Sequence, residues 1–319
     1  MRALKQNEEI RALKKHNMQH ILTRIKREQF CYFLILPSFI ATAIFCYWPL
    51  YGLLLAFKDL RLSKGIMGSP WVGLKWFELM FRDPTFLLVI RNTLIISFSK
   101  LLLGTFACII LALLLNEIRS NLYKKICQTL LYLPHFLSWV IMASVIYTIF
   151  TMSGGLYSKI MTNVFGREPI QILANPAYFR TMVYVSDIWK GVGFGTIIYL
   201  AAITGIDSEL YEAGIIDGAN RLQRVLFITI PSIKSTIIIL LILSLGGVMN
   251  AGFDQILNLY SPNTIAVGDI IDTYVYRRGL QSLQYSYSTA VGLFKNVINV
   301  LLLVAVNYFA KLIGEEGLY

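Results

Sequence analysis

Charged and amide side chains lie inside long apolar stretches of this sequence, where they are costly and therefore point to a function. Asp187 and Lys190 flank Trp189 in one stretch. In two further stretches, polar residues recur at the spacing of one helix face. These are Gly247, Asn250, Asp254 and Asn258 in one stretch, and Ser288, Gly292, Lys295, Asn296 and Asn299 in the other. The three faces predict a shared cavity in the outer half of a membrane, where a polar solute binds by hydrogen bonds, with Trp189 and Tyr260 as aromatic platforms.

A purely structural interpretation of the same residues remains open. Asp187 and Lys190 are three residues apart and could form an internal ion pair. The asparagines could join neighbouring helices by hydrogen bonds, as polar residues commonly do in membranes.

A second polar stretch, residues 206–231, separates two apolar runs. Asp207 and Ser208 suit a helix N-cap, and Gly218 can end that helix in a left-handed conformation. Asn220 can cap a second short helix, and Pro231 opens the next apolar run at a position where its missing N–H costs little. The expected helix–turn–helix would either dock into a groove on a partner protein or simply cap two spans.

Motifs of common enzyme chemistry are missing from the sequence. It has no G-x-x-x-x-G-K-[ST] loop to cradle ATP phosphates, and no H-E-x-x-H or C-x-x-C metal pattern. "GVGFG" at 191–195 lies inside an apolar run, so it predicts close helix approach or a helix break and not a dinucleotide loop. We therefore expect no enzymatic activity and no cofactor held by this chain.

The elements that must position these residues are membrane-spanning helices. The 319 residues are 56% hydrophobic and only 15% charged, which is typical of a polytopic membrane protein. The net charge of +11 is better explained by anionic lipid than by nucleic acid. Six spans are expected, at roughly 30–57, 92–116, 129–151, 181–205, 232–257 and 289–312.

Lysine and arginine residues predict the orientation of these spans. Residues 1–28 form a basic segment with eight of them, and one face of the membrane carries fifteen against eleven on the other. Because basic segments tend to stay in the cytoplasm, we expect both termini and the 206–231 loop on that side of a bacterial cytoplasmic membrane. The remaining chain, 29–319, is expected to be one membrane domain.

The 206–231 stretch resembles a motif of permease subunits from binding-protein-dependent ABC importers, E-A-A-x-x-x-G followed after nine residues by I-x-L-P. Glu212, Ala213, Gly218, Ile228 and Pro231 match it, while Gly214 replaces the second alanine and Ile230 replaces leucine. The longer "ELYEAGIIDGAN", which includes Asp217, is similar to the carbohydrate-uptake branch and to the maltose importer membrane subunits. Residues 71–94, 130–140 and 274–294 resemble the same branch, so the likeness covers roughly 30–319.

This resemblance implies a type I importer fold of six spans, with a coupling helix between spans four and five that contacts an ATPase. It implies as partners a second permease subunit, two cytoplasmic ATPase subunits that bind ATP and magnesium, and an extracytoplasmic solute-binding protein. It implies a sugar or oligosaccharide as solute, and the buried lysines would suit an acidic, uronate-containing one. An ion-coupled secondary transporter and a membrane scaffold without transport role are the alternatives.

Overall fold

The structure of the protein, a computed structural model, describes residues 27–312, apart from the side chains of residues 310 and 312. This part of the chain is mostly helical and contains no β-strand, only an isolated bridge between Lys58 and Trp71. Three helices are long and apolar enough to cross a membrane, or up to six spans exist if each of three bent helix pairs counts as one. The predicted all-α polytopic fold is confirmed. All but the last two residues of the basic segment 1–28 lie outside the described residues.

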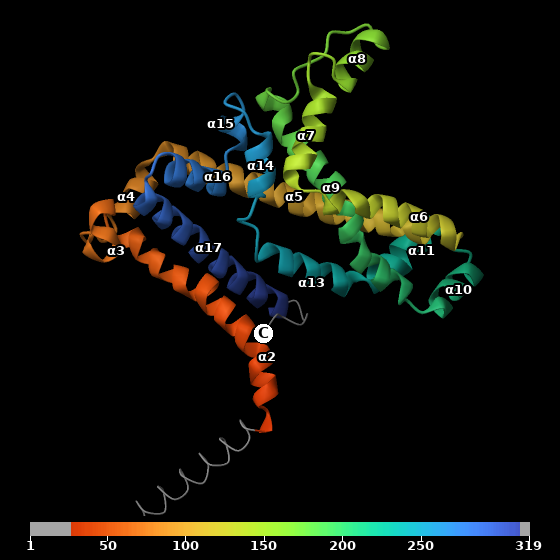
Figure 1. Ribbon diagram of the computed structural model, residues 1–319. Helices are drawn as coiled ribbons and strands as arrows, with labels where there is room; N and C mark the ends of the chain where they lie inside the picture. Colours follow the sequence, from red (N-terminus) through yellow and green to blue (C-terminus); the bar gives the residue numbers. More distant parts are fainter. Residues whose placement is uncertain (1–26, 313–319) are drawn as a thin grey trace, which may run out of the picture.

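The first span is continuous but changes its helical geometry twice. It consists of α2 (Gln29–Thr42), the π-helical η1 (Ala43–Tyr47) and the 3₁₀-helical η2 (Trp48–Phe57). The π turn comes just before Pro49, whose ring would clash with the carbonyl four residues earlier in a regular helix. η2 packs against the last helix of the chain (Figure 1). Most other side chains of this span are exposed, so lipid or another subunit must cover them.

Two long helices, α5 (Pro84–Asn116) and α9 (Pro176–Thr204), pack along each other through the middle of the molecule (Figure 1). Each begins with a capped proline start: Asp83 accepts a hydrogen bond from the Thr85 N–H at 2.8 Å, and Asn175 accepts one from the Ala177 N–H at 3.0 Å. These helices begin eight and five residues before the starts expected from hydropathy. The difference arises because capping and proline define a helix start, whereas hydropathy registers only apolar content.

The glycine-rich segment 191–195 stays helical within α9 and brings helices close together. A Cβ atom on Gly193 would lie 2.0 Å from the Leu131 carbonyl oxygen, and one on Gly195 would lie 2.7 Å from the Cys108 sulfur. Of the two expectations for this segment, close approach is therefore correct, and the helix break does not occur.

Two other spans are broken. Span three consists of α6 (Asn121–Tyr132), η4 (Leu133–Phe136) and α7 (Trp139–Phe150), with a bend of 102° before α7. In place of one span at 232–257, α13 (Lys234–Leu245) ends early, and seven non-helical residues lead into α14 (Phe253–Leu259). Three of these seven, Gly246, Gly247 and Gly252, are glycines. Irregular backbone at membrane depth is tolerated where protein buries it or where it lines a cavity.

The remaining short helices gather mainly at the end of α5 where that helix begins, and α17 closes the bundle (Figure 1). The short helices are η3 (Leu62–Lys64), α3 (Gly65–Gly68), α4 (Lys75–Arg82), α8 (Leu156–Asn163), α15 (Ile265–Gly268), α16 (Ile271–Tyr276) and η6 (Arg277–Gln281). The last span is the long helix α17 (Tyr285–Leu312). α8 continues the arm that α7 forms away from the long helices.

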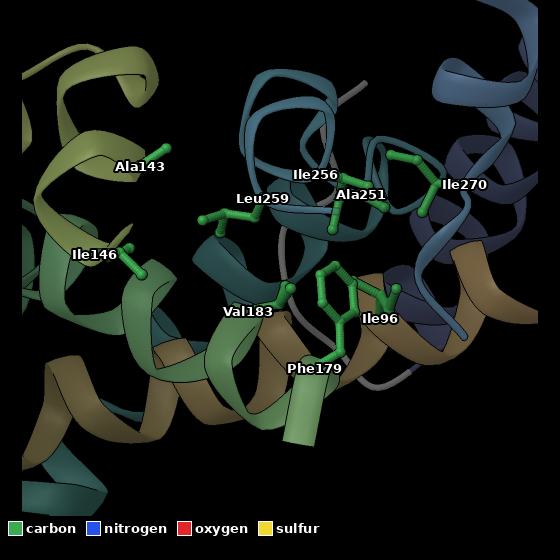
Figure 2. Packing of buried hydrophobic residues seen from close by; sticks show 9 residues of the cluster. All are labelled: Ile96, Ala143, Ile146, Phe179, Val183, Ala251, Ile256, Leu259 and Ile270. Carbon is green, nitrogen blue, oxygen red and sulfur yellow. The ribbon is translucent and has the colours of Figure 1, made fainter. Parts of the chain in front are cut away.

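A buried apolar cluster holds the α14 region against the long helices (Figure 2). Within this cluster, Phe179 of α9 and Ile96 of α5 lie beneath the α14 segment. Ile146 of α7 lies beside it, on the side of Leu259. Burying side chains of this size contributes about 1.5–3 kcal/mol each, so the cluster gives the irregular segment a firm base. The backbone that leaves span five is thus held in place by α5, α7 and α9.

Candidate functional site

A polar cavity of about 300 Å³, here called the central cavity, lies where α5, α9 and the broken span five meet. Two of the predicted solute-path residues, Asp187 and Asn250, line it. The full lining is Ser97, Lys100, Leu101, Asp187, Ser244, Gly247, Val248, Asn250 and Gly252. The polar faces expected on spans four and five therefore do meet, at the point where span five stops being helical.

Lys100 connects the walls of the central cavity, although it is not among the residues predicted from the sequence. Its Nζ lies 3.0 Å from an Asp187 carboxylate oxygen and donates to the Ala251 carbonyl at 2.9 Å. Only 11% of the Lys100 side chain is exposed, against 33% of the Asp187 side chain. The sequence could have indicated this role, because Lys100 is the only charged residue of the span expected at 92–116.

Gly252 adapts the broken backbone to this lysine. Its φ of +93° favours glycine, and a Cβ atom there would lie 2.7 Å from the Lys100 Nζ. The next turn carries Gln255, whose amide nitrogen donates to the Val183 carbonyl and the Ser186 hydroxyl, both at 2.8 Å. The Gln255 carbonyl oxygen is buried and has no hydrogen-bond partner among residues 27–312. The non-helical segment of span five is thus held by Lys100 of α5 on one side and by Val183 and Ser186 of α9 on the other.

The interpretation of Asp187 and Lys190 as an ion pair is wrong, because each has a different partner. Lys190 donates to the carbonyls of His135 at 2.7 Å and Leu137 at 2.5 Å, and lies 3.4 Å from the Pro134 carbonyl. These carbonyls lie where span three bends and have lost regular helical partners. Lys190 therefore caps a broken helix, and it is absent from the lining of the central cavity.

The polar face of span six makes contacts of its own. The Lys295 Nζ lies 2.5 Å from an Asp272 carboxylate oxygen, and the Asn299 carbonyl oxygen accepts from the Met249 N–H at 3.3 Å. Asn299 thereby ties α17 to the irregular part of span five, whereas Asn296 is exposed. Lys295, Asn296 and Asn299 do not line the central cavity. The prediction that the polar faces of three spans form one cavity is therefore wrong for span six.

The two expected aromatic platforms also lie elsewhere. Trp189 lines a separate, apolar cavity of about 380 Å³ between α7 and α9. Tyr260 packs against the buried cluster of Figure 2. Asp254 is exposed, and its carbonyl accepts a hydrogen bond from the Asn258 side chain at 2.7 Å. The central cavity itself has no aromatic wall.

A larger cavity of about 520 Å³, the end pocket, opens where α5 begins. Asp83 there accepts a hydrogen bond from the Tyr274 hydroxyl at 2.8 Å and pairs with Arg278 at 3.2 Å. Burial, the largest influence, raises the pKa of the Asp83 carboxyl, but the hydrogen bonds from Tyr274 and Thr85 and the charge of Arg278 outweigh it. The Asp83 pKa consequently lies below its usual value. Burial and the hydrogen bonds with Tyr287 and Asp83 raise the pKa of Tyr274.

The 206–231 stretch, here called the coupling loop, forms the helix–turn–helix expected from its caps. α10 (Ser208–Ile216) starts at Asp207, which accepts from the Glu209 N–H at 3.0 Å. Gly218 follows with a φ of +77°, and its N–H donates to the Ile215 carbonyl at 3.1 Å. The second helix is reciprocally capped by Asn220 and Gln223. It comprises α11 (Arg221–Arg224) and the π-helical η5 (Val225–Thr229), and α12 (Ile230–Ser232) contains Pro231.

The coupling loop has an inner and an outer face. On the inner face, the hydroxyls of Tyr211 and Thr229 lie 2.9 Å apart, and a Cβ atom on Gly214 would lie 2.9 Å from the Ile228 side chain. The glycine at 214 therefore makes room for the returning chain. The outer face exposes Glu212, Ala213, Asp217 and Gly218, together with Ile216, which is 86% exposed. A free apolar residue beside acidic ones is typical of a helix that docks into a partner.

Comparison with known proteins points in the same direction. Residues 104–315 match the family model described as "Binding-protein-dependent transport system inner membrane component". The chain is 44% identical over 306 residues to the polygalacturonan/rhamnogalacturonan transport system permease protein YteP of Bacillus subtilis (strain 168), covering 96% of this chain and 95% of that one. It is also 44% identical to protein LplB of the same organism, covering 93% of each.

A solved structure shares the fold. A chain in the crystal structure of a bacterial alginate ABC transporter, in complex with an alginate pentasaccharide-bound periplasmic protein, superposes with a TM-score of 0.83 at 38% sequence identity. The match covers 93% of this chain and 99% of that one. The resemblance inferred from the coupling loop is confirmed, and the alternatives of an ion-coupled transporter and a scaffold are set aside. This chain belongs to the family of inner-membrane components of binding-protein-dependent transport systems, with the six-span fold of ABC importer permeases.

Proposed function

We propose that this chain is one of two membrane subunits of an ATP-driven importer for an oligosaccharide that contains uronic acid. The observation that carries the proposal is the central cavity, where Lys100, Asp187 and Asn250 meet at the break of span five. The matched solved structures support the solute class, since one is described as importing the acidic polysaccharide alginate. The relative YteP, whose name refers to polygalacturonan and rhamnogalacturonan, also supports this solute class.

The chemistry of the central cavity suits transient binding of such a sugar. An ammonium group carries three N–H donors, and Lys100 directs two of its hydrogen bonds to Asp187 and Ala251. A donor is left for a uronate carboxylate, while Asp187 and Asn250 can bind sugar hydroxyls. Because Asp187 already neutralises Lys100, an acidic sugar would be held only weakly, and a translocation path needs sites that release the solute.

The coupling loop is the proposed docking point for an ATPase. Its outer face, with Glu212, Ala213, Asp217 and Gly218, would insert into a groove of one of two ATPase subunits, which hold ATP and its magnesium. Gly214 and Pro231 would act from within, Gly214 by close packing and Pro231 by starting the next span. A second permease subunit would cover the exposed first span and complete the cavity. An extracytoplasmic binding protein would deliver the solute at the end pocket.

This assignment places the coupling loop and both termini in the cytoplasm. The orientation can be tested with cysteines introduced singly at Ser208, in the loop, and Ser261, near the opposite end. An impermeant thiol reagent added to intact cells should label position 261 and spare position 208, with the native cysteines replaced. Labelling of 208 and not of 261 would invert the orientation.

The solute class can be tested with the complete importer in proteoliposomes. Lys100→Gln should reduce uptake of an oligogalacturonide about tenfold relative to uptake of its methyl ester, because one charge-assisted hydrogen bond is worth that much. The ratio of the two rates is the readout, since general damage to the fold lowers both. Lys159→Gln, which removes an exposed lysine from α8, is the matched control. An unchanged ratio in Lys100→Gln would refute uronate recognition here, and uptake without ATP would refute the importer itself.

A further inference from the structure

A second polar cavity, the loop pocket, lies between the C-terminal end of α5 and the inner face of the coupling loop. Its volume is about 290 Å³. The lining is Leu113, Asn116, Glu117, Arg119, Tyr211, Arg221, Arg224, Val225 and Thr229. Three arginines face one acid, so the pocket carries a surplus of two positive charges. Neither solute passage in the bundle nor docking by the outer face of the loop uses these side chains.

The arginines of the loop pocket differ in how they are paired. Arg221 lies 3.6 Å from Glu117, but both side chains are more than half exposed, so water screens this pair. Arg119 and Arg224 form no ion pair within the described part of the chain. The Nε of Arg224 is inaccessible to solvent and has no hydrogen-bond partner in the residues described. A buried donor of this kind is costly unless an acceptor comes to it.

The position of Arg224 is set by its surroundings. An ideal Cβ on Gly214 would lie 3.7 Å and 3.9 Å from the Cγ and Cδ of Arg224, so the arginine stem packs over the glycine of α10. The Tyr211–Thr229 contact closes the loop behind it, and the Thr229 hydroxyl lies 3.4 Å from the Arg224 carbonyl. The stem that carries the guanidinium is therefore packed in place, and such preorganisation favours ligand binding.

We propose that the loop pocket binds a phosphate group. Guanidinium groups match the oxygens of a phosphate with paired N–H donors, and Tyr211, Thr229 and Asn116 offer further hydrogen bonds. Leu113 and Val225 add an apolar wall on the side of the spans, which suits the glycerol and first acyl carbons of a lipid. If the coupling loop faces the cytoplasm, as proposed above, the pocket lies at the anionic headgroup layer of the inner leaflet. A bound phosphate would then tie the coupling loop to the end of α5.

The phosphate can come from an anionic lipid or from solution, and the experiment distinguishes the two. The complete importer would be reconstituted in phosphatidylcholine nanodiscs with phosphatidylglycerol, extracted, and examined by native mass spectrometry. In the second arm, inorganic phosphate would be added to the delipidated complex while its thermal unfolding is followed. For each arm, Arg119→Gln/Arg224→Gln is compared with Arg167→Gln, which removes one exposed charge from the segment after α8.

Retention of phosphatidylglycerol that falls about tenfold in the double variant, but not in Arg167→Gln, identifies a lipid headgroup as the ligand. A phosphate-induced rise in the unfolding temperature that the double variant alone loses identifies a soluble phosphate. If neither signal depends on the two arginines, the proposal is wrong, and the pocket accepts a carboxylate of the docked ATPase or nothing. A single Arg119→Gln variant, which leaves the Arg224 stem over Gly214 of α10 in place, guards against misfolding. Because binding is measured without solute or ATP, these outcomes are independent of the transport assay.

Discussion

The coupling loop and the central cavity both interrupt apolar helices, yet their contacts reach very different distances along the chain. In the loop, the caps and the turn connect residues at most five apart, such as Asn220 with Gln223 and Ala219 with Gly214. In the central cavity, Lys100 contacts Asp187 and the carbonyl of Ala251, which is 151 residues away. A local device can be copied between proteins as a motif, whereas a distant one depends on the packing of whole helices.

The two regions also use glycine for different ends. Gly218 supplies a left-handed turn with nothing within 4 Å of its missing Cβ. Gly252 supplies a left-handed turn and, in addition, space for the ammonium group of Lys100. Substitutions at these two positions should therefore separate docking of the ATPase from transport of the solute.

The largest effect is expected from Gly218→Pro in the coupling loop. Proline cannot adopt a positive φ and lacks the N–H that bonds the Ile215 carbonyl, so the turn after α10 should be lost. We expect the variant to insert in the membrane but to lose most co-purification with the ATPase subunit. Gly218→Asn is the control, since asparagine tolerates the left-handed conformation and keeps the N–H. Normal ATPase recovery with Gly218→Pro would show that docking does not need this turn.

A somewhat smaller effect, confined to transport, is expected from Gly252→Ala. The added methyl group would push Lys100 away from Asp187 and would strain the backbone by about 1–3 kcal/mol. Solute uptake by the reconstituted importer should fall about tenfold or more, while the ATPase remains bound. Gly104→Ala is the matched control, because that glycine has open space around it on α5. Equal uptake by both alanine variants would contradict the role given to the Lys100 contacts.

Lys190→Met distinguishes the structural role of Lys190 from the solute role expected from sequence. Removing the ammonium leaves the carbonyls of His135 and Leu137 without their donor, which should destabilise the protein by about 1–3 kcal/mol. The unfolding temperature in detergent should fall. The preference for an acidic over an esterified oligosaccharide should not change. A lost preference with unchanged stability would return Lys190 to the solute path. Lys159→Met, at an exposed position, controls for loss of charge.

The smallest effect is expected from Asp83→Asn at the end pocket, and it should depend on pH. Because the Asp83 pKa is lower in the folded state than its ordinary value of 3.8, the ionised carboxylate stabilises the fold above that value. This contribution should vanish as the pH falls through the folded pKa. Asparagine keeps the helix cap, so the variant should be less stable by about 1 kcal/mol near neutral pH and equal to wild type at strongly acidic pH. Denaturant titrations across this range would measure the difference, and a pH-independent gap would exclude the charge as its cause.

Much of the coupling loop could be predicted because its determinants are contiguous. Asp207, Gly218 and Asn220 each act on backbone groups a few residues away, and these are the positions where the structure has the cap, the turn and the second cap. The inner face was not foreseen. The contact between Gly214 and Ile228 requires knowing how the second helix returns, which is a matter of packing.

The central cavity could be predicted only in part. Helical spacing correctly brought Asp187 and Asn250 to one site, but it assumed that span five was a continuous helix. The three glycines at 246, 247 and 252 were the available sign of a break. Spacing also could not choose a partner for Asp187. Both Lys100 of α5 and Lys190 of α9 could have paired with Asp187. In the structure Lys100 does so, whereas Lys190 donates to the unpaired carbonyls at the bend of span three.

The sequence by itself determined that this protein crosses a membrane several times and that residues 206–231 form a capped helix–turn–helix. These properties follow from apolar length and from hydrogen bonds between near neighbours, which act before helices meet. Only the tertiary structure decided that Lys100 pairs with Asp187 across two helices, that Lys190 caps a broken span, and that three arginines share one pocket beneath the coupling loop. Those arrangements depend on which helix faces approach each other. A buried charge takes its partner from whatever donor or acceptor the completed packing leaves within hydrogen-bonding distance.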